Sequence, residues 1–159
     1  MSKQNHDLDR TDRMILRLLQ QDGALTTPKL AERLSLSVTP CWRRLKRLEK
    51  EGYIRDYQAN LDRQRLGFDV LAFVQLSFGV HTDTSANLFE AMILDHPEVL
   101  SCHKITGSAD YMLQVVATDL VAYGDFIEQV LRKISGVSVI HSSLALREIK
   151  STNRLPIGD

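Results

Sequence analysis

The feature that most constrains the fold is a change in the spacing of apolar residues near residue 70. Before that point, apolar residues recur every three to four positions, which is the spacing of one helical face. After it, short segments alternate apolar and polar residues, as half-buried strands do, and two helical segments lie between them. The pattern predicts an α+β chain with domains at residues 7–56 and 70–159, joined by a linker strand or hinge at 57–69.

The charge of the chain is divided between these two parts. Residues 1–65 hold 14 Lys and Arg against 9 Asp and Glu, whereas residues 66–159 hold 6 against 11, so that the net formal charge is zero. A positive first half favours a polyanionic partner. The alternative is a chance distribution of charge over solvated surfaces.

The composition is that of a globular chain, with 43% hydrophobic and 25% charged residues. No apolar run approaches the roughly 18 residues of a membrane span, and the N-terminus lacks the apolar core of a signal peptide. Cys41 and Cys102 have no metal-like spacing and are expected to stay reduced. We therefore expect a cytoplasmic protein without a membrane partner.

The first domain is predicted to contain three helices. The segment "LDRTDRMILRLLQQDG" places four leucine or isoleucine residues at a helical period and ends at Gly23. In "LTTPKLAERLSLS", Thr27 and Pro28 begin a second helix, and "SLS" leaves only a tight turn before the third. Two short helices joined in this way form a helix-turn-helix, whose second helix enters a DNA major groove.

The third helix, in "SVTPCWRRLKRLEKEG", separates apolar from cationic residues. At about 100° per residue, one stripe is apolar and the opposite face is polar and positive. The apolar stripe contains Val38, Cys41, Leu45 and Leu48. The opposite face carries Thr39, Arg43, Lys46, Arg47 and Lys50, with Trp42 and Arg44 on the two flanks. Such a face fits DNA, although an ordinary solvated helix surface is the alternative.

The start of this helix suits a phosphate because its N–H groups are unpaired. Early side chains of a recognition helix reach bases and later cations reach phosphates, so we assign base readout to Thr39 and Arg43. Trp42 either stacks on Arg or sugar, or half covers the core. The predicted DNA-binding residues are Ser37, Thr39, Pro40, Trp42, Arg43, Lys46, Arg47 and Lys50. The following "YIRDYQANLD" is predicted to form a wing or linker strand, where Arg55 could contact a phosphate.

The second domain has the predicted order strand–helix–strand–strand–helix–strand, the ferredoxin-like βαββαβ arrangement with both helices on one face of the sheet. "VLAFVQLSFGV" directs Ala72, Val74, Leu76 and Phe78 to one face. A stripe of Leu88, Phe89, Met92 and Ile93 marks the first helix, and Asp119 caps the second. By alternation, Leu71, Phe73, Leu144 and Leu146 lie on the uncovered face. An uncovered apolar sheet face predicts a homodimer.

The sequence shows no catalytic constellation, so we expect no enzyme. It contains no glycine-rich phosphate loop, metal-ligand cluster or nucleophile motif, and no cofactor is expected. Neighbouring strand residues point to opposite faces, so Cys102 and His103 cannot form a reactive pair. The loop "TGSADY" offers the Asp110 carboxylate beside exposed N–H groups, which suits an amine and a carboxylate together; a plain turn is the alternative.

These motifs together resemble the Lrp/AsnC family of bacterial and archaeal transcriptional regulators, also called leucine-responsive or feast/famine regulators. The resemblance depends on "SVTPCWRRLKRLEKEGYI", "TGSADYML" and "SSLALREIKSTNRLP" in this order, and it spans about Leu8 to Pro156. It implies a winged-helix-like DNA-binding domain, an amino-acid effector and homodimers that assemble to octamers on the bacterial nucleoid.

The resemblance further implies an effector site between dimers, against the Gly–Asp loop. Carried onto this sequence, the effector-binding residues are Gly107, Asp110 and Tyr111, with Ser142 and Ser143 on the last strand. A branched-chain or sulfur-containing amino acid is the implied effector, and genes of amino-acid metabolism are the implied targets. The rival hypothesis is an architectural DNA-wrapping protein with no small-molecule effector.

Overall fold

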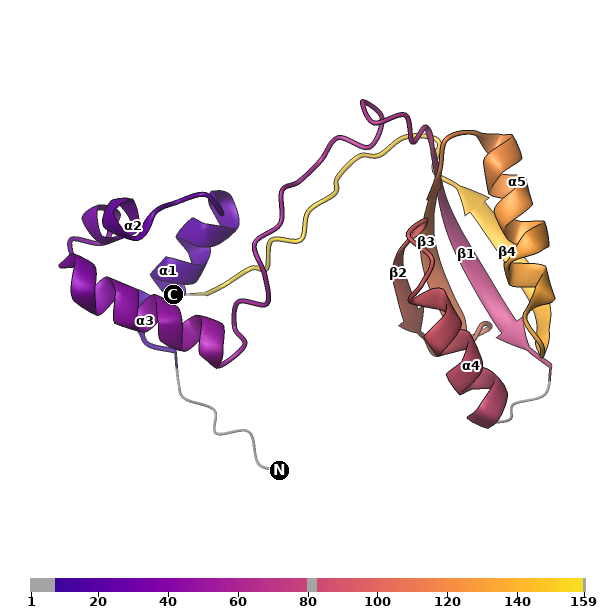
Figure 1. Ribbon diagram of the computed structural model, residues 1–159, viewed down its shortest axis with the longest axis horizontal. Helices are drawn as coiled ribbons and strands as arrows, with labels where there is room; N and C mark the ends of the chain where they lie inside the picture. The colour runs from indigo at the N-terminus through magenta and orange to yellow at the C-terminus, as the bar shows by residue number, and fades with distance from the viewer. Residues whose placement is uncertain (1–7, 80–82, 159) are drawn as a thin grey trace. The chain divides into compact units, whose positions relative to one another are not determined.

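The computed structural model describes residues 8–79 and 83–158, which form two compact units (Figure 1). One unit contains the chain up to Leu61 together with the residues from Lys150 onward, and the other is Asp62–Ile149. The predicted division differs at its C-terminal end, because the structure groups the last residues with the helical unit. Along the chain, the second unit is thus inserted between two segments of the helical unit.

The helical unit contains α1 (Arg10–Gln21), α2 (Thr27–Arg33) and α3 (Val38–Lys50), as predicted. α1 begins with a capping box, in which Asp9 Oδ1 accepts the Asp12 N–H at 2.8 Å and Asp12 Oδ2 accepts the Asp9 N–H at 3.3 Å. Pro28 lies in the first turn of α2, where a missing N–H removes no helical hydrogen bond. Local sequence therefore sets the helix starts.

The core of this unit joins all three helices. Its buried members are Ile15, Leu16, Leu30, Ala31, Cys41, Leu45 and Leu48. The prediction that Val38 belongs to the buried stripe of α3 is wrong, because its side chain is 48% exposed. Val38 is the first residue of α3, and the buried positions begin one turn later, at Cys41.

The strand predicted after Gly52 does not form, and residues 53–69 contain no strand. Gly52, at a φ of +79°, ends α3. The chain then extends to a turn in which Asp62 Oδ1 accepts the Gln64 N–H at 3.0 Å. A weakly alternating segment needs a neighbouring strand to pair with, and the chain itself supplies none here.

The C-terminal segment packs on α1. The Gln20 side chain pairs with both polar groups of the Leu155 backbone, accepting its N–H at 2.5 Å and donating to its carbonyl at 3.2 Å. Arg17 Nε donates to the Ile157 carbonyl at 2.9 Å, and the Ile157 side chain packs against the core of the helical unit. The segment therefore completes the helical unit.

Removing residues 153–159 is expected to lower the free energy of unfolding of the helical unit by about 4 kcal/mol, from roughly 1 kcal/mol for each of the three lost hydrogen bonds and about 1 kcal/mol for the exposure of Ile157. Urea denaturation followed by the fluorescence of Trp42, the single tryptophan of the chain, measures this unit. Gln20→Ala should lose about half as much, and Gln21→Ala, on the exposed side of α1, is the control. An unchanged midpoint in the truncated protein would show that the segment does not stabilise α1.

The second unit has the predicted βαββαβ order. Its elements are β1 (Val70–Phe78), α4 (Asp83–Ile93), β2 (Val99–Lys104), β3 (Tyr111–Ala117), α5 (Leu120–Gln129), the 3₁₀ turn η1 (Leu131–Lys133) and β4 (Val137–Leu144). The strands form one antiparallel sheet in the order β2-β3-β1-β4. Asp119 caps α5 by accepting the Ala122 N–H at 2.8 Å, as predicted.

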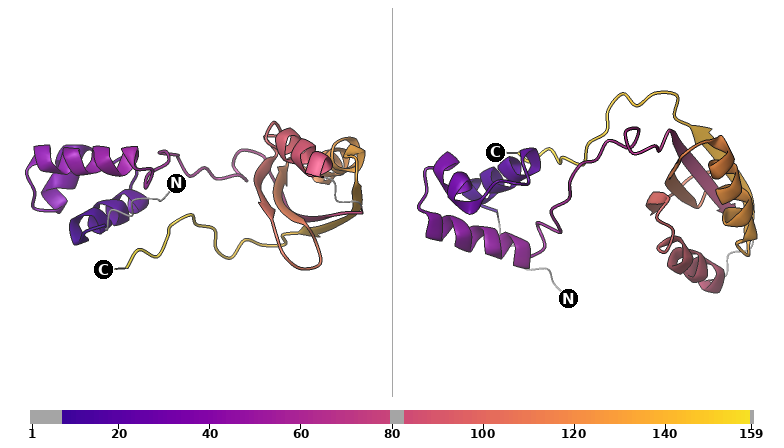
Figure 2. Two further views of the ribbon diagram at one scale, coloured as in Figure 1. Left: turned by 90° about the horizontal axis from the view of Figure 1, so that it is seen from below. Right: turned by 45° about the horizontal axis from the view of Figure 1, so that its top comes forward.

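Both helices cover one face of the sheet (Figure 2), and the core lies between them and the strands. Ala72, Val74, Leu76 and Phe78 are buried on that face, as alternation predicted. The predicted stripe of α4 is wrong at one position, because Leu88 is 66% exposed whereas Phe89 and Ile93 are buried.

The uncovered face is less apolar than predicted. Leu144 pairs with Ala72 and therefore shares the helix-covered face, so its assignment to the open face is wrong. Leu71 is on the open face but only 4% exposed, and Leu146 lies beyond the end of β4. The register places Phe73, Gln75, Gln114, Met112, His141 and Ser143 on this face.

Candidate nucleic-acid interface and effector-binding loop

The outward side of α3 presents most of the predicted DNA contacts to solvent. The exposed members of the set are Ser37, Thr39, Pro40, Trp42, Arg43, Lys46 and Lys50. The Trp42 side chain is 50% exposed, so much of its ring surface is open to solvent. α3 thus carries a polar and cationic surface opposite its buried Cys41, Leu45 and Leu48.

Arg47 differs from the rest of the predicted set because it turns toward α1. Its Nη2 pairs with Oδ2 of Asp12, which is only 1% exposed. Arg44 Nη1 binds the other carboxylate oxygen of Asp12 at 2.9 Å and also pairs with Asp9. The Asp12 N–H and Arg44 hold the pKa of Asp9 below its ordinary value. These ion pairs fix α3 against α1 and so set the orientation of the exposed face.

This ion-pair cluster, formed by Asp9, Asp12, Arg44 and Arg47, was missed by sequence reasoning. A signal for it was present: Asp12 lies three and four positions before Ile15 and Leu16, and therefore on the apolar side of α1. A carboxylate at a buried position needs a cation as its partner. The arginine-rich third helix was the available source of that cation.

Lys46 is held at the protein surface by a neighbouring carboxylate. Its Nζ pairs with Glu49 Oε2 at 2.6 Å, and Tyr57 Oη donates to Glu49 Oε1 at 3.0 Å. Lys46 lowers the pKa of Glu49, whereas desolvation and Glu49 raise the pKa of Tyr57 to about 12. An exposed ion pair of this kind is worth little, so a phosphate can replace Glu49 as the partner of Lys46.

The loop between β2 and β3 is fixed to the end of β1. Gly107 has a φ of +117°, which other residues rarely adopt. Asp110 N donates to the Leu76 carbonyl at 2.9 Å, and Asp110 Oδ2 accepts the Phe78 N–H at 2.8 Å. The Asp110 carboxylate therefore holds the loop in place, a role beyond the plain turn considered from sequence.

Tyr111, the next predicted effector residue, points into the core. Its ring contacts Phe78 and Phe89, and its Oη donates to Glu90 Oε1 on α4 at 2.7 Å. Desolvation, followed by the Glu90 hydrogen bond, raises its pKa to about 12. The Tyr111 side chain thus links the loop to α4.

Tyr111→Phe is expected to weaken the loss of stability at high pH. An unfolded tyrosine ionises near pH 10, whereas folded Tyr111 keeps its proton to about pH 12. Its contribution is therefore complete below about pH 10 and is lost as the pH rises through about 12. Absorbance at 295 nm should show a smaller late-titrating phase in Tyr111→Phe, while Tyr53→Phe serves as the control. An unchanged late phase would contradict the assignment.

The structure does not bring Ser142 and Ser143 to this loop within one chain. Ser142 Oγ faces the helices and binds Tyr123 Oη at 2.6 Å, whereas Ser143 pairs with Phe73 on the open face. The loop contacts Leu76 and Phe78 near the end of β1, on the side of that strand that pairs with β3. The two serines are on β4, which pairs with the other side of β1, and they lie near the start of β1.

Cys102 and His103 point to opposite faces, as predicted, because they pair with Leu113 and Met112 respectively. Within residues 8–79 and 83–158, no group of three or more His, Cys, Asp or Glu side chains has the arrangement of a metal site. Among the helices of the described residues, none combines the length and apolar character that a membrane crossing requires.

Two family descriptions match the two parts of the chain. "Winged helix-turn-helix DNA-binding" matches residues 8–55 and "Lrp/AsnC ligand binding domain" matches residues 71–155. The DNA-binding match includes α3, and the ligand-binding match includes the Gly107–Asp110 loop.

Known proteins are similar over nearly the whole chain. The Bkd operon transcriptional regulator of Pseudomonas aeruginosa is 44% identical over 95% of this chain and 99% of its own length. The leucine-responsive regulatory protein of Escherichia coli K12 is 34% identical over 95% and 92%. A crystal structure of a Neisseria meningitidis transcriptional regulator in complex with L-Met has a TM-score of 0.90 and 41% identity, covering 94% of this chain and 97% of that one. This chain belongs to the Lrp/AsnC family of transcriptional regulators, and not to a family of enzymes.

Proposed function

We propose that the protein regulates transcription by binding double-stranded DNA through α3, with an affinity that changes when an amino acid binds the C-terminal unit. The observation that carries this proposal is the exposed face of α3 in a helix-turn-helix. There, Arg43, Lys46 and Lys50 are exposed. The buried Asp12 holds the inner arginines of the same helix against α1.

In this proposal the residues of α3 divide into two roles. Thr39 and Arg43 lie early in the helix and read base edges, Arg43 at a guanine. Lys46 and Lys50 lie later and contact phosphates, while Ser37 and Pro40 bring the helix start to the backbone. Arg47 is assigned to support of the helix, because its guanidinium is paired with Asp12.

Lys50→Ala is expected to weaken binding to all DNA sequences about equally. Each phosphate that a lysine neutralises releases about one counterion, so the magnitude of the negative slope of log K against log salt should fall by roughly 1 for each bound copy of the chain. Titrations of operator and scrambled duplexes at several salt concentrations measure both effects. Glu51→Ala changes the neighbouring residue at the end of the helix. It is the control, in which the magnitude of the slope should not decrease. A selective loss for operator DNA would reassign Lys50 to base readout.

The effector is proposed to be a branched-chain or sulfur-containing amino acid. Relatives support this chemistry: one is named leucine-responsive, and another was crystallised with L-Met. The Gly107–Asp110 loop of one copy and Ser143 on the sheet of another are the proposed contacts, with Tyr111 and Ser142 supporting them. Such a site requires a homodimer that assembles further, to an octamer, through surfaces that include the open sheet face.

A thermal-shift screen of the twenty amino acids, without and with a duplex from upstream of the protein's own gene, tests the proposal. A ligand that binds only the native state raises the melting temperature, and a regulatory ligand also changes DNA affinity by the reciprocal factor. Asp110→Asn should lower the affinity of the protein for that ligand. If the protein binds DNA but no amino acid at millimolar concentration raises its melting temperature, the architectural DNA-wrapping function is favoured. A DNA-bound protein of this kind would reside on the nucleoid, in the cytoplasm of a bacterium.

A further inference from the structure

A cavity of about 440 Å³ opens in the C-terminal unit between α5, the end of β3 and the segment that leads into β2. Ala117, Ala122 and Phe126 contribute to its apolar wall, and His96, Glu98 and Asp125 lie at its polar side. None of residues 106–111, Ser142 or Ser143 lines it. It is therefore distinct from the proposed effector site.

The polar side of the cavity is acidic. Two carboxylates line it, and none of its lining residues is Lys or Arg. The Glu98 side chain is partly exposed, but its Oε2 atom is buried and has no hydrogen-bond donor among the described residues. His96 Nδ1 lies 3.6 Å from this atom, beyond hydrogen-bond distance, and the two groups form an ion pair when His96 is protonated.

The backbone of Glu98 and the ring of His96 are held by their surroundings. The Glu98 backbone carbonyl accepts the Val116 N–H at 2.9 Å, which ties it to β3. The His96 ring packs edge-on against the Phe126 ring, with centroids 5.7 Å apart. Ordered backbone and packed rings therefore place the apolar wall of the cavity beside Glu98, whose Oε2 atom has no hydrogen-bond donor in the described part of the chain. A buried acceptor of this kind is available to an N–H group of a ligand.

We propose that this cavity binds a small primary amine with an apolar alkyl or aryl body. An ammonium group has three donors and a positive charge, which match Glu98 Oε2 and the Asp125 carboxylate. The apolar body packs against Ala117, Ala122 and Phe126, and the volume is in the range of small-molecule sites, roughly 300–1,000 Å³. A free amino acid fits less well, because its carboxylate would face two carboxylates.

The test is a thermal-shift and calorimetric titration of the full-length protein with 3-methylbutylamine. The neutral 3-methylbutanol has the same apolar body, and leucine adds a carboxylate to the amine. We expect saturable binding of the amine, with affinity at least about tenfold weaker for the alcohol, from the loss of a charge-assisted hydrogen bond. Leucine should not compete with it. Equal affinity for amine and alcohol, or no saturable signal at 10 mM, would overturn the proposal.

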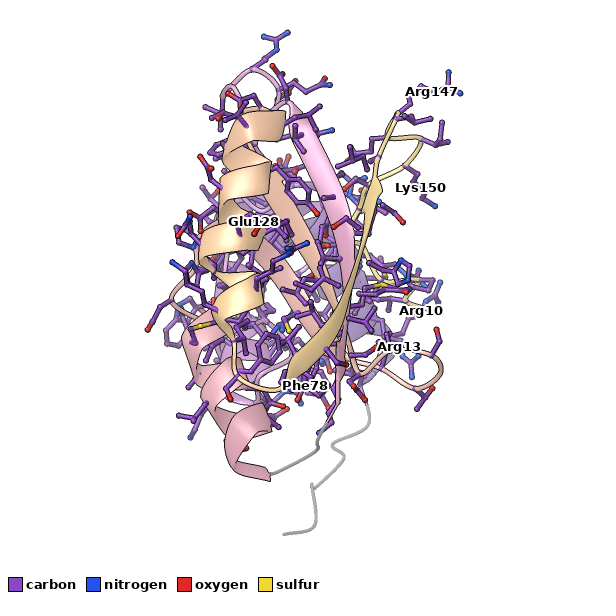
Figure 3. All side chains as sticks on the ribbon, turned by 90° about the vertical axis from the view of Figure 1, so that its right-hand side faces the viewer. Arg10, Arg13, Phe78, Glu128, Arg147 and Lys150 are labelled. Carbon is purple, nitrogen blue, oxygen red and sulfur yellow. The ribbon has the colours of Figure 1, made fainter. Side chains whose placement is uncertain are left out.

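Two substitutions locate the binding. Glu98→Gln and Asp125→Asn should each lower the affinity for the amine about tenfold and leave the affinity for the alcohol unchanged. Asp125 is exposed, so its variant is expected to fold even if Glu98→Gln does not. Glu128→Gln is the matched control: it is on the same helix (Figure 3), is not among the residues that line the cavity, and pairs with Arg132 at 3.3 Å. Amine affinity that is insensitive to both lining substitutions would place the ligand elsewhere and refute the assignment.

Discussion

Asp12→Ala is expected to lower the free energy of unfolding of the helical unit by about 3 kcal/mol, near the lower end of the cost of breaking a buried ion pair. The substitution removes the carboxylate that binds both Arg44 and Arg47, and it also breaks the capping box at the start of α1. The two arginines are 33% and 39% exposed, so they regain part of their hydration, which limits the loss.

Trp42 fluorescence during urea denaturation measures this loss, since Trp42 lies in the same unit. Asp12→Asn keeps the size of the side chain without its charge, so it should cost less than the alanine variant. Glu51→Ala changes an exposed carboxylate and should have little effect. A loss below about 1 kcal/mol in Asp12→Ala would mean that the cluster does not hold α3 against α1.

Arg43→Ala is expected to remove most of the preference for operator over scrambled DNA. One bidentate contact from arginine to guanine is worth about 1–3 kcal/mol of discrimination, and a dimer that reads two half-sites makes it twice. The expected loss of discrimination is therefore about 2–6 kcal/mol. Arg43 is exposed and belongs to neither core, so the fold should be kept.

Competition binding with operator and scrambled duplexes at one salt concentration measures the discrimination. Arg43→Lys separates charge from shape, because lysine keeps the positive charge but cannot make the planar bidentate contact. The Arg43→Lys variant should retain its affinity for scrambled DNA and still lose its preference for operator DNA. Wild-type discrimination in Arg43→Ala would show that another residue reads the bases.

Much of the fold could be predicted from the sequence, because local signals and tertiary packing agree. The helix starts at Asp9 and Pro28 and the cap at Asp119 depend on neighbours within four residues. The alternation of β1 decided its buried face in the same way. The errors have separate causes: Val38 lies one turn before the buried part of α3, Leu88 lies on the exposed side of α4, and Leu144 was assigned to the wrong face of β4.

The candidate sites were predictable only as types of residue and not as geometry. A basic helix can be recognised from its composition, but which arginines face outward depends on Asp12, which is 32 residues before Arg44. Likewise, the loop sequence "TGSADY" indicated a special turn, whereas the bond from Phe78 N–H to Asp110 required the pairing of strands. The cavity near Glu98 has no signal in the sequence, because its lining comes from separate elements.

The sequence by itself determined the two-part organisation, the βαββαβ order and the cationic character of α3, because periodicity and charge are properties of neighbouring residues. Only the tertiary structure decided that Arg47 is bound to α1, that the C-terminal segment completes the helical unit, and that Ser142 is separated from the Gly107–Asp110 loop. These features depend on contacts between residues far apart in the chain, and such contacts are set by packing and strand register, which no local pattern encodes.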